Sequence, residues 1–512
     1  MKLDRVAVIG GGPGGLYAAR LLKLSNPKAE ITVYEQSSPD TTFGFGVGLA
    51  SRTQRNLRQA DAASLDAIVA QAYSHEMSMQ VGNRTARLAH GDLLAIARTS
   101  LLSVLQEQAR DAGVRLEFGE RREPADLDVD LVIASDGINS ATRTADGRFG
   151  ADITTGTGLY LWCGTDFALE SAIFVPVTTE HGTFVAHAYP YAPDRSTFLI
   201  ETDLDTWHRA GFDVTTTATG AAHSDEASLR YLEKAFSVTL QDHSLIGNRT
   251  RWMQFRTVKC RKWSVDNIVL LGDAAHTAHY SIGSGTKLAM EDAIALDAAL
   301  ASAATVGDAL TEYERVRRPA VEHLQQIAVR SEQWWESFPQ RMDLPVDQLM
   351  VAYMTRAGKV GLERFLESAP EVAWKGIASY ARVPADSEVP ADVSRWILSR
   401  RIEHGGRSFS DRFAPPDLRE DPTTTVVSVD VESAWNEKAT AIVDESRASS
   451  TVWLTGSGER DHVLTRLDVA ERMMRSTGAL VVVDVPEECL SDAVAGLVSA
   501  RTHLVFVGSR RR

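Results

Sequence analysis

A chain of 512 residues, 44% of them hydrophobic, is long enough for two or three domains with a large buried core. Its 54 basic and 68 acidic residues give a formal net charge of −14, which disfavours nucleic acid and anionic membranes as partners. The 3 cysteines show no Cys-x-x-Cys pair, so we expect neither a metal site nor a redox disulfide. We expect a cytoplasmic protein, because the first apolar run is a strand rather than a signal peptide and no apolar run reaches membrane-span length.

The first predicted element is a β-α-β unit with a glycine-rich turn. An apolar strand at 6–9 runs into a Gly-x-Gly-x-x-Gly turn, a helical pattern follows, and the next strand, 31–35, ends on an acid. Such a turn lets backbone amides approach a pyrophosphate at a helix N-terminus, while the acid accepts hydrogen bonds from a ribose and repels a 2′-phosphate. The unit therefore predicts FAD or NAD rather than NADP. Its expected cofactor residues are Gly10, Gly12, Pro13, Gly15, Glu35 and Gln36.

Two acidic turns farther along the chain favour FAD. Asp136-Gly137 follows the buried strand 130–134, and Gly272-Asp273 follows the strand 267–271. An acid at the carboxyl end of such a strand can hold a ribityl hydroxyl of FAD. The glycines after the second turn, together with a helix that starts near Gly285, can seat a phosphate and the flavin edge.

With these three segments in this order, the chain resembles the single-component, class A flavoprotein aromatic hydroxylases. It resembles more closely the salicylyl-CoA 5-hydroxylases and the monooxygenase half of 2-aminobenzoyl-CoA monooxygenase/reductases. Three stretches carry that likeness: Thr42-Phe-Gly-Phe-Gly-Val, Ala186-His-Ala-Tyr-Pro and His276-Thr-Ala-His-Tyr-Ser-Ile-Gly-Ser-Gly-Thr-Lys. The general class usually has Pro in place of His279 and Gln in place of Ser284, and both departures favour the CoA-ester subgroup. The likeness runs from residue 1 to about 365 and thins past 400.

The resemblance implies an NAD(P)H- and O₂-dependent monooxygenase that hydroxylates an aromatic acyl-CoA. In the family, NADPH or NADH reduces FAD, O₂ adds as a flavin C4a-hydroperoxide, and one oxygen passes to an electron-rich ring carbon. The donor binds transiently, which agrees with the lack of a second Gly-x-Gly-x-x-Gly turn after a strand. A 2-hydroxy or 2-amino group on the benzoyl ring directs attack most simply to C5. We expect a monomer or a homodimer.

Three residues are candidates for the chemistry. Histidine is the usual acceptor of a phenol proton near neutral pH, and His279 stands beside the expected flavin in place of a proline. A packing or capping histidine is the alternative. His187 and Tyr189 share one face of a strand by their period-two spacing and are expected to line the pocket, although ordinary sheet packing gives the same pattern.

Further residues are expected at the cofactor. Arg98 matches a class position whose guanidinium reaches the FAD pyrophosphate, while a surface arginine is the alternative. His276 more often supports its loop than performs chemistry, so we assign it to the cofactor site only. Lys287 can stabilise an anionic reduced flavin. The expected set in these segments is Phe45, Gly46, Val47, Arg98, Asp136, Gly137, Gly272, Asp273, His276, Gly283, Ser284, Gly285, Thr286 and Lys287.

An anionic acyl-CoA requires a local basic patch on this acidic chain. One candidate is the run of cations at 249–262; a solvated strand edge is the equal alternative. A second candidate combines Arg317, Arg318 and Arg356. The run consists of Arg249, Arg251, Arg256, Lys259, Arg261 and Lys262.

The fold class expected is α/β, with a Rossmann-like FAD-binding domain of the glutathione-reductase type, an antiparallel-sheet substrate domain, C-terminal helices and a small α/β appendage. The last ninety or so residues look faintly like the final units of an old-yellow-enzyme barrel but are too few for eight units of a chain of about 250 residues. We therefore expect no second flavin and no ene-reductase activity there; an unrelated flavodoxin-like appendage fits equally. The expected boundaries are 1–155 and 259–330 for the FAD domain, 156–258 for the substrate sheet, 331–382 for the helices, 383–424 for a linker and 425–512 for the appendage.

Three other functions agree with the sequence. The chain can be a hydroxylase of a free or carrier-bound aromatic, such as an indole, and a CoA-sized channel with basic residues at its mouth would argue against that. It can be a flavin-dependent reductase or dehydrogenase that inserts no oxygen, which O₂ consumption would test. A flavin-loaded binding protein is the third alternative.

Overall fold

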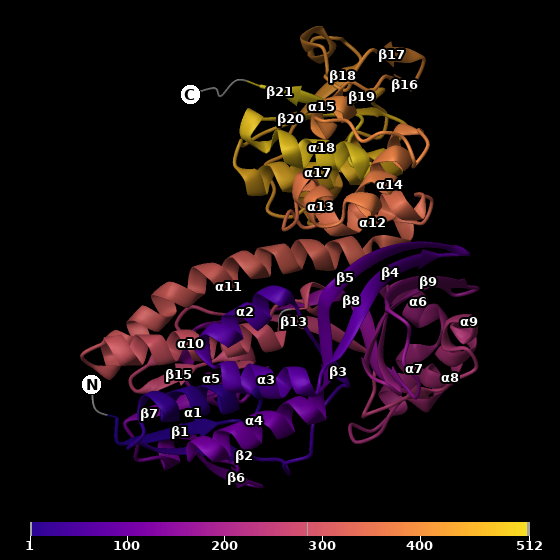
Figure 1. The fold of residues 1–512 in the computed structure, drawn as a ribbon. Coiled ribbons are helices and arrows are strands. Elements are labelled where there is room, and N and C mark those ends of the chain that lie inside the picture. Colours follow the sequence, from indigo (N-terminus) through magenta and orange to yellow (C-terminus); the bar gives the residue numbers. More distant parts are fainter. Residues whose placement is uncertain (1–2, 284, 509–512) are drawn as a thin grey trace. The chain divides into compact units, whose positions relative to one another are not determined.

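The computed structural model describes residues 3–283 and 285–508. These residues group into two compact units (Figure 1). The first unit takes residues 1–78 and 89–336, and the second takes 79–88 and 337–512. Ser284, one of the expected cofactor residues, lies outside the described residues.

A parallel sheet forms the FAD-domain part of the first unit. Its strand order is β14-β15-β7-β1-β2-β6, with β1 parallel to β2 and β7, and β15 parallel to β7. Val8, Ile133 and Val269 are fully buried, as expected for strands covered on both faces. Because these strands run in parallel, the turns that follow β1, β7 and β15 meet at one edge of the sheet. The strands are β1 (Arg5–Ile9), β2 (Glu30–Glu35), β6 (Arg115–Phe118), β7 (Leu131–Ala134), β14 (Ser264–Val265) and β15 (Ile268–Leu270).

Helices cover this parallel sheet. Pro13 is the first residue of α1, a position where its missing N–H costs no hydrogen bond. α1 packs against α10 so closely that a Cβ on Gly14 would lie 2.7 Å from Leu271 Cδ2 and 2.9 Å from Ala289 Cβ. The helices are α1 (Pro13–Ser25), α2 (Ser51–Ala60), α3 (Ala62–Ala70), α4 (Arg98–Ala112), α5 (Ala141–Ala145), α10 (Gly285–Ser302) and α11 (Val306–Glu336).

The second sheet of the first unit is mainly antiparallel. Its strand order is β12-β8-β11-β10-β9-β4-β5-β3, and β13 also pairs with β8. The sheet takes in more of the chain than the expected 156–258, because β3, β4 and β5 join it from residues 46–97. The strands are β3 (Gly46–Leu49), β4 (Tyr73–Val81), β5 (Arg84–Ala97), β8 (Ala151–Thr165), β9 (Ala172–Thr179), β10 (Gly182–Ala192), β11 (Arg195–Thr202), β12 (Leu245–Ile246) and β13 (Met253–Cys260).

The two faces of this antiparallel sheet differ. Phe184, Ala186 and Phe198 belong to an apolar cluster shared with the helices α6–α9. The alternate residues of β10 include His187 and Tyr189, which therefore lie on the opposite face. The helices are α6 (Leu204–Arg209), α7 (Phe212–Ala218), α8 (Glu226–Ala235) and α9 (Ser237–Leu240).

The second unit contains a four-stranded parallel sheet, β18-β19-β20-β21. Its core includes the fully buried Trp453, and a buried two-hydrogen-bond ion pair joins Arg341 to Glu471 at 2.7 Å. The expected linker and appendage, with the expected helical region from residue 337 onward, thus fall into one compact unit, while residues 331–336 end α11 in the first unit. The linker segment carries ordered elements. The elements are α12 (Val346–Thr355), α13 (Leu362–Ser368), α14 (Pro370–Ala381), α15 (Val393–Leu398), β16 (Ile402–His404), β17 (Arg407–Phe409), β18 (Thr424–Ser428), α16 (Glu437–Glu445), β19 (Thr451–Thr455), α17 (Arg460–Ser476), β20 (Leu480–Val485), α18 (Leu490–Val498) and β21 (Leu504–Val507).

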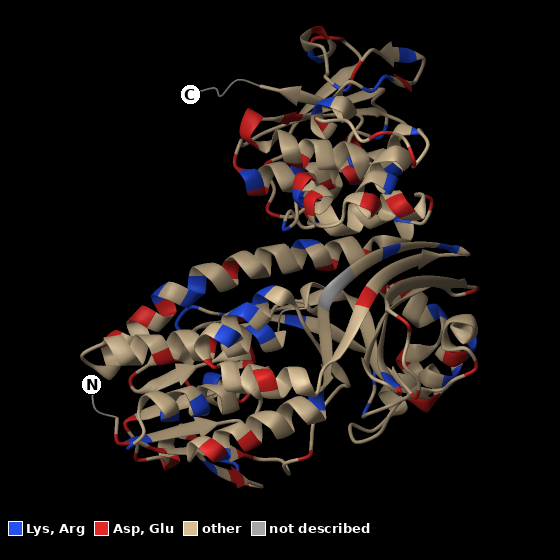
Figure 2. Ribbon diagram, in the orientation of Figure 1, with Lys and Arg blue, Asp and Glu red and all other residues tan. Residues whose placement is uncertain are grey.

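Charge and hydropathy complete the description of the fold. Lys and Arg are interspersed with Asp and Glu along α11 (Figure 2). Among the described residues, no helix combines the length and the apolar character that crossing a membrane requires. Cys163, Cys260 and Cys489 are all free and buried.

Candidate active site

The glycines of the turn after β1 have two different roles: Gly10 and Gly15 allow close packing of the backbone, whereas Gly12 borders open space. Gly10 has a φ of +106°, and a Cβ there would lie 2.4 Å from the carbonyl oxygen of Ser135. A Cβ on Gly15 would lie 2.2 Å from the carbonyl oxygen of Gly10. A Cβ on Gly12 would meet no described atom within 4 Å, although Gly12 caps the N-terminus of α1. The turn therefore leaves open space at the end of a helix that favours an anion.

Glu35 is held in place beside this turn. Its carboxylate accepts hydrogen bonds from the backbone N–H of Gly11 and of Ser37, both at 2.8 Å. Gln36, the next residue, is exposed. The acid therefore stands within the turn region, where a ribose hydroxyl can reach it.

The turn after β7 presents an acid with an unmet hydrogen bond. Asp136 Oδ2 accepts from the backbone N–H of Thr142 at 3.1 Å, whereas Oδ1 is buried and finds no partner among the described residues. Gly137 has a φ of +77°, and a Cβ there would meet no described atom within 4 Å. A buried carboxylate oxygen without a partner indicates a missing donor, such as a ligand hydroxyl.

The turn after β15 is supported from beneath by a buried ion-pair network. Asp292, fully buried, contacts His276 Nε2 at 2.8 Å, accepts from Arg317 Nε at 2.8 Å and accepts from the Gly272 N–H at 3.0 Å. Burial alone would raise the pKa of Asp292, but the charges and hydrogen bonds of His276 and Arg317 hold it below its usual range. His276 is thus a support of the loop, while Asp273 is exposed.

Arg143 connects the last two turns. Its guanidinium donates to the carbonyl oxygen of Ile138 at 2.6 Å and to that of Ala274 at 2.8 Å. The Asp136 turn and the Gly272 turn, far apart in the sequence, are therefore held at a fixed spacing by one buried side chain.

The N-terminus of α10 faces open space. Gly283 has a φ of +59°, and neither Gly283 nor Gly285 would bring a Cβ within 4 Å of another described atom. Thr286 and Lys287 occupy the first turn of this helix and are half-buried. Burial lowers the pKa of Lys287, and its ammonium lies 3.7 Å from Glu291.

The loop before β3 approaches the same region. Arg98 opens α4, donates from Nη1 to the carbonyl oxygen of Phe43 at 2.8 Å and stacks 5.5 Å from the Trp162 ring centre. The backbone of Gly46 donates to Thr197 Oγ1 at 2.9 Å and accepts from the Tyr189 hydroxyl at 2.8 Å. Phe45 precedes this clamp, and the buried Val47 follows it. Tyr189 therefore positions β3 rather than standing free for chemistry.

These observations fit FAD. A fixed acid beside a glycine turn suits an adenosine ribose, the open helix N-termini suit the diphosphate, and the unpartnered Asp136 oxygen suits a hydroxyl of the linker to the flavin. Glycines stand where a side chain would enter the open space. The turns after β1, β7 and β15 come together at one edge of the parallel sheet.

A second group of residues, here called the carboxylate cluster, lies on the inner face of the antiparallel sheet. His187 Nε2 stands 3.3 Å from Glu201 Oε2, and both side chains are about nine-tenths buried. The His187 ring centre is 4.1 Å from that of Trp335 and 6.5 Å from that of Tyr280. The cluster consists of His187, Glu201, Tyr280, Glu332 and Glu336.

The titration behaviour of the carboxylate cluster follows from burial and like charge. Burial, then the charges of Glu336 and Glu201, raise the pKa of Glu332 to about 8. Burial also raises the pKa of Glu336, although its carboxylate accepts from the N–H groups of Thr157 and Gly158. Glu201 behaves in the opposite way: burial tends to raise its pKa, but His187, His279 and Tyr280 together lower the pKa below its usual range.

Tyr280 belongs to the cluster, and His279 borders it. Burial, reinforced by the Glu201 carboxylate, raises the pKa of Tyr280 well above its usual range. His279 packs against Tyr280 with ring centres 4.0 Å apart, and its Nδ1 lies 2.8 Å from Ser281 Oγ and accepts from the Ser281 N–H at 3.3 Å. His279 thus caps the short helix at 280–282, and a neutral imidazole with that Nδ1 acceptor carries its proton on Nε2.

Comparison with known proteins agrees with this geometry. The family model for the FAD binding domain matches residues 4–328, more than half of the chain. A 3-hydroxy-4-methyl-anthranilyl-[aryl-carrier protein] 5-monooxygenase from Streptosporangium sibiricum is 39% identical over 358 residues, covering 70% of this chain and 95% of the relative. The chain belongs to the FAD-dependent aromatic monooxygenase family.

Two further relatives of this monooxygenase chain are informative. A salicyloyl-CoA 5-hydroxylase from Streptomyces sp is 45% identical over 340 residues, and the match spans 65% of this chain and 66% of that relative. The crystal structure of a mutant 2-methyl-3-hydroxypyridine-5-carboxylic acid oxygenase matches with a TM-score of 0.53 at 19% identity, covering 73% of this chain and 96% of the other. The second likeness concerns the fold alone.

The expectations for this monooxygenase chain divide into three groups. The family, the α/β fold class and FAD as cofactor are confirmed. The structure places His187 and His279 at the same cluster, and it places Tyr189 on Gly46 instead. Sequence reasoning missed Glu201, Tyr280, Glu332 and Glu336; an acid within an apolar strand and a tyrosine beside His279 were the available signals.

Several cations of the two predicted basic patches have separate partners in the structure. Arg251 donates to the carbonyl oxygen of Thr216, and Arg256 donates to Asn139, so these two neighbours in the run serve different loops. Arg317 is buried on Asp292, whereas Arg356 lies in the second unit. Of the six cations in the first patch, Arg249 lines a cavity.

Proposed function

We propose that the protein is an NAD(P)H- and O₂-dependent FAD monooxygenase that hydroxylates an aromatic ring carried as a thioester, of the salicylyl-CoA or 2-aminobenzoyl-CoA type, at C5. Two relatives support this substrate class and position. One is named for salicyloyl-CoA and the other for an anthranilyl group on an aryl-carrier protein, and both names give position 5. FAD, when reduced and exposed to O₂, supplies the oxygen that the ring accepts.

The observation that carries the proposal is the buried His187–Glu201 pair, 3.3 Å apart, which Tyr280 approaches from the short helix at 280–282. A ring hydroxyl becomes a better electron donor when its proton is drawn away. In this proposal His187 accepts that proton, and Glu201 stabilises the resulting imidazolium as an adjacent carboxylate does. A positively charged His187 lowers the pKa of Glu201, so the carboxylate is ionised whenever the imidazole carries the extra proton.

Aromatic side chains exclude water from this group. The centre of the His187 ring lies 4.1 Å from that of Trp335 and 5.1 Å from that of Phe174. The ring centres of Tyr280 and Tyr160 are 4.9 Å apart. A dry surrounding protects an oxygenating cofactor from hydrolysis and strengthens each polar contact. An aromatic substrate packs favourably on such rings.

Glu332 has a distinct part in this proposal. With a pKa of about 8 it stays protonated at neutral pH, so it can donate a hydrogen bond to a carbonyl oxygen without adding negative charge beside the ring. A thioester carbonyl is such an acceptor. Glu332 therefore orients the acyl group while His187 addresses the ring hydroxyl.

The test is a turnover assay of the FAD-loaded protein with salicyloyl-CoA and 2-aminobenzoyl-CoA, supplied with NADPH or NADH under isotopically labelled O₂. The expected product gains one labelled oxygen at C5, which mass spectrometry and NMR identify. If NAD(P)H is consumed and every aryl thioester returns unchanged, with O₂ recovered as hydrogen peroxide, the proposal is wrong.

Free salicylate and an indole acid serve as comparison substrates in the same assay. Hydroxylation of either at a rate above that of the thioesters would favour the alternative of a free-aromatic hydroxylase. Oxidation of NAD(P)H without O₂ consumption, coupled to reduction of an organic acceptor, would favour the reductase alternative.

A further inference from the structure

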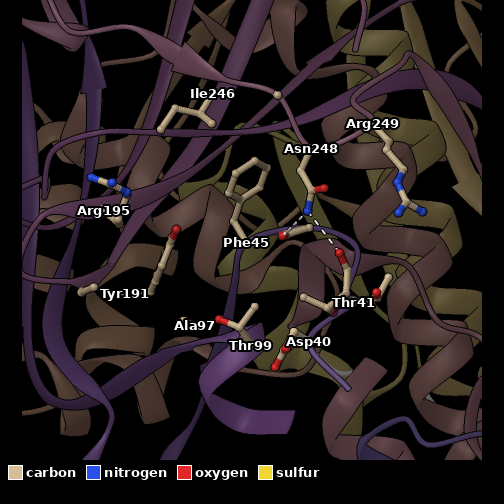
Figure 3. Close-up of a pocket in the computed structure, with 14 residues that line it drawn as sticks. Asp40, Thr41, Phe45, Ala97, Thr99, Tyr191, Arg195, Ile246, Asn248 and Arg249 are labelled. Atoms are coloured by element: carbon tan, nitrogen blue, oxygen red, sulfur yellow. Dashed lines mark hydrogen bonds between the residues drawn. The ribbon is translucent and has the colours of Figure 1, made fainter. Parts of the chain in front are cut away.

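A groove of about 610 Å³ opens in the first unit beside the loop before β3 (Figure 3). One part of its wall is apolar or aromatic and the other part is polar and charged. Thr41, Asn248 and Arg249 contribute to the polar part, which also holds the Asp40 carboxylate. The apolar part includes Phe45, Ala97, Tyr191, Ala192 and Ile246.

The polar wall is built rather than incidental. Asn248 donates from Nδ2 to the carbonyl oxygens of Thr42 and Gly44, both at 3.2 Å, and so fixes the loop at 245–250 to the loop before β3 (Figure 3). Arg249 follows with a φ of +54°, a conformation that non-glycine residues rarely adopt. Backbone strain of this kind persists only where the surrounding contacts maintain it.

Arg249 is an uncompensated cation at this groove. Its side chain is exposed, and within residues 3–283 and 285–508 it forms neither an ion pair nor a hydrogen bond. Arg195, on the other side of Phe45 in Figure 3, is already paired with Asp194 at 3.2 Å. The groove therefore presents one cation that is available to an anion.

The groove and the carboxylate cluster share strand β10. Tyr191 and His187 are four residues apart on this strand, about 13 Å at the usual rise, with a register irregularity between Pro190 and Ala192. The backbone of Gly46 contacts this strand, since it accepts from the Tyr189 hydroxyl and a Cβ on it would lie 2.8 Å from Tyr191 Cδ1. A ligand with one end in the groove and the other at the cluster must therefore be long.

We propose that this groove binds the phosphopantetheine arm of an aryl thioester, with its phosphate on Arg249. This inference rests on the proposed function and adds the site that recognises the carrier. The apolar and hydrogen-bonding wall suits an arm that alternates methylene and amide groups. The same arm is present in CoA and on an acyl carrier protein, so the shared chemistry is a phosphodiester or phosphomonoester linked to an amide chain.

The charges of Arg249 and Asp40 bear on the proposed phosphate site. A chain with a net charge of −14 repels a phosphorylated ligand at long range, so one local cation has a large relative effect. The carboxylate of Asp40 lines the same groove and opposes the phosphate. The two charges therefore give variants with opposite expected effects.

The experiment measures KM and kcat of the FAD-loaded enzyme with three salicyl thioesters: those of CoA, of 4′-phosphopantetheine and of pantetheine without phosphate. For Arg249→Ala we expect KM to rise about tenfold with both phosphorylated thioesters, because a charge-assisted hydrogen bond is lost. KM with the pantetheine thioester and kcat with all three should stay unchanged. Asp40→Asn should lower KM for the phosphorylated pair about twofold.

Arg230→Ala is the matched control, because Arg230 is exposed on α8 in the same unit, carries the same charge and does not line the groove. It should leave every KM unchanged. A rise in the KM of NADPH or NADH for Arg249→Ala would assign the groove to the electron donor and overturn the inference. An equal loss with the phosphate-free thioester would overturn it as well.

The same assay shows whether Arg249 recognises the phosphopantetheine arm or the nucleotide of CoA. It also distinguishes failure of the proposed function from failure of the proposed groove. A loss confined to the CoA ester would place Arg249 on the nucleotide and overturn the assignment to the arm. Wild-type enzyme that uses the phosphopantetheine thioester as well as the CoA ester recognises the arm alone. If wild type hydroxylates none of the thioesters, the proposed function itself fails; if it hydroxylates them and Arg249→Ala changes nothing, only this inference fails.

Discussion

The parallel sheet and the antiparallel sheet of the first unit build their functional edges in different ways. At the parallel sheet, the residues that fit FAD come from turns at strand ends, where backbone amides and open glycine positions stand beside the carboxylates of Glu35 and Asp136. At the antiparallel sheet, His187 and Glu201 come from within strands, and their side chains determine the chemistry. Short sequence motifs are therefore enough to predict the FAD site. The carboxylate cluster cannot be predicted in this way, because it depends on the register between strands.

The largest effect is expected at the glycine turn, where substitutions test whether the fold and flavin binding depend on the same residues. Gly15→Ala would bring a Cβ to 2.2 Å from the backbone of Gly10, and we expect a loss of about 3 kcal/mol of stability together with all bound flavin. Gly12→Ala meets no described atom and should retain the melting temperature of the flavin-free protein while losing flavin affinity. Thermal unfolding and flavin absorbance measure both. Normal flavin content in Gly12→Ala would contradict the assignment of that open space to the diphosphate.

A second prediction concerns the carboxylate cluster, where the fold should be insensitive and the chemistry sensitive. Glu201→Gln keeps the shape of the side chain but removes the charge beside His187, and we expect kcat for hydroxylation to fall about 100-fold. Flavin reduction in stopped-flow experiments should be nearly unchanged. Glu180→Gln, an exposed acid on the turn between β9 and β10, is the control and should match wild type. Equal activity of both variants would remove Glu201 from the mechanism.

A third prediction concerns the pH dependence of stability, which Glu332 should dominate in the carboxylate cluster. Its pKa is raised from an ordinary 4.5 to about 8, so the folded protein holds this proton more tightly than the unfolded chain. The contribution of this carboxyl to stability is fully present below pH 4.5 and is lost as pH rises through about 8. Urea unfolding between pH 5 and 9 should show this decline in wild type, and Glu332→Gln should remove it. A decline of the same size in the glutamine variant would place the titration on another group.

The smallest effect is expected where the two regions meet. Tyr189→Phe removes the hydrogen bond to the Gly46 carbonyl and should cost about 1 kcal/mol of stability. Since we assign Tyr189 to positioning β3, kcat should fall less than tenfold. A fall comparable with that of Glu201→Gln, measured in the same turnover assay, would return Tyr189 to the catalytic group.

The sequence was sufficient for the part of the protein whose signals are local. The strand, the glycine turn and Glu35 lie within thirty or so residues of each other, so their spacing predicts both the fold of the FAD domain and its cofactor. Glu332 reaches β8 from a helix more than 170 residues later, where a Cβ on Gly156 would lie 2.1 Å from its Oε1. No short pattern encodes such an approach, and neither does the addition of β3–β5 to the antiparallel sheet.

The two candidate histidines could be singled out from the sequence, but their partners could not. The motif singles out His279, and the structure shows that its Nδ1 caps a short helix while its ring packs on Tyr280. Strand periodicity singles out His187 and predicts the correct face of the sheet but not the partner. Glu201 lies on the next strand, and only the β10–β11 register brings the two together.

The bridge that Arg143 makes between the Ile138 and Ala274 carbonyls also joins two segments that the ribosome synthesises far apart in time. The segment that contains Arg143 is synthesised before strands β8 to β13 of the antiparallel sheet, and the loop that it holds is synthesised after them. The Asp136 turn and the Gly272 turn can therefore come together only after strands β8 to β13 have been synthesised. The part of the flavin site that these two turns form is incomplete until the ribosome has passed residue 274.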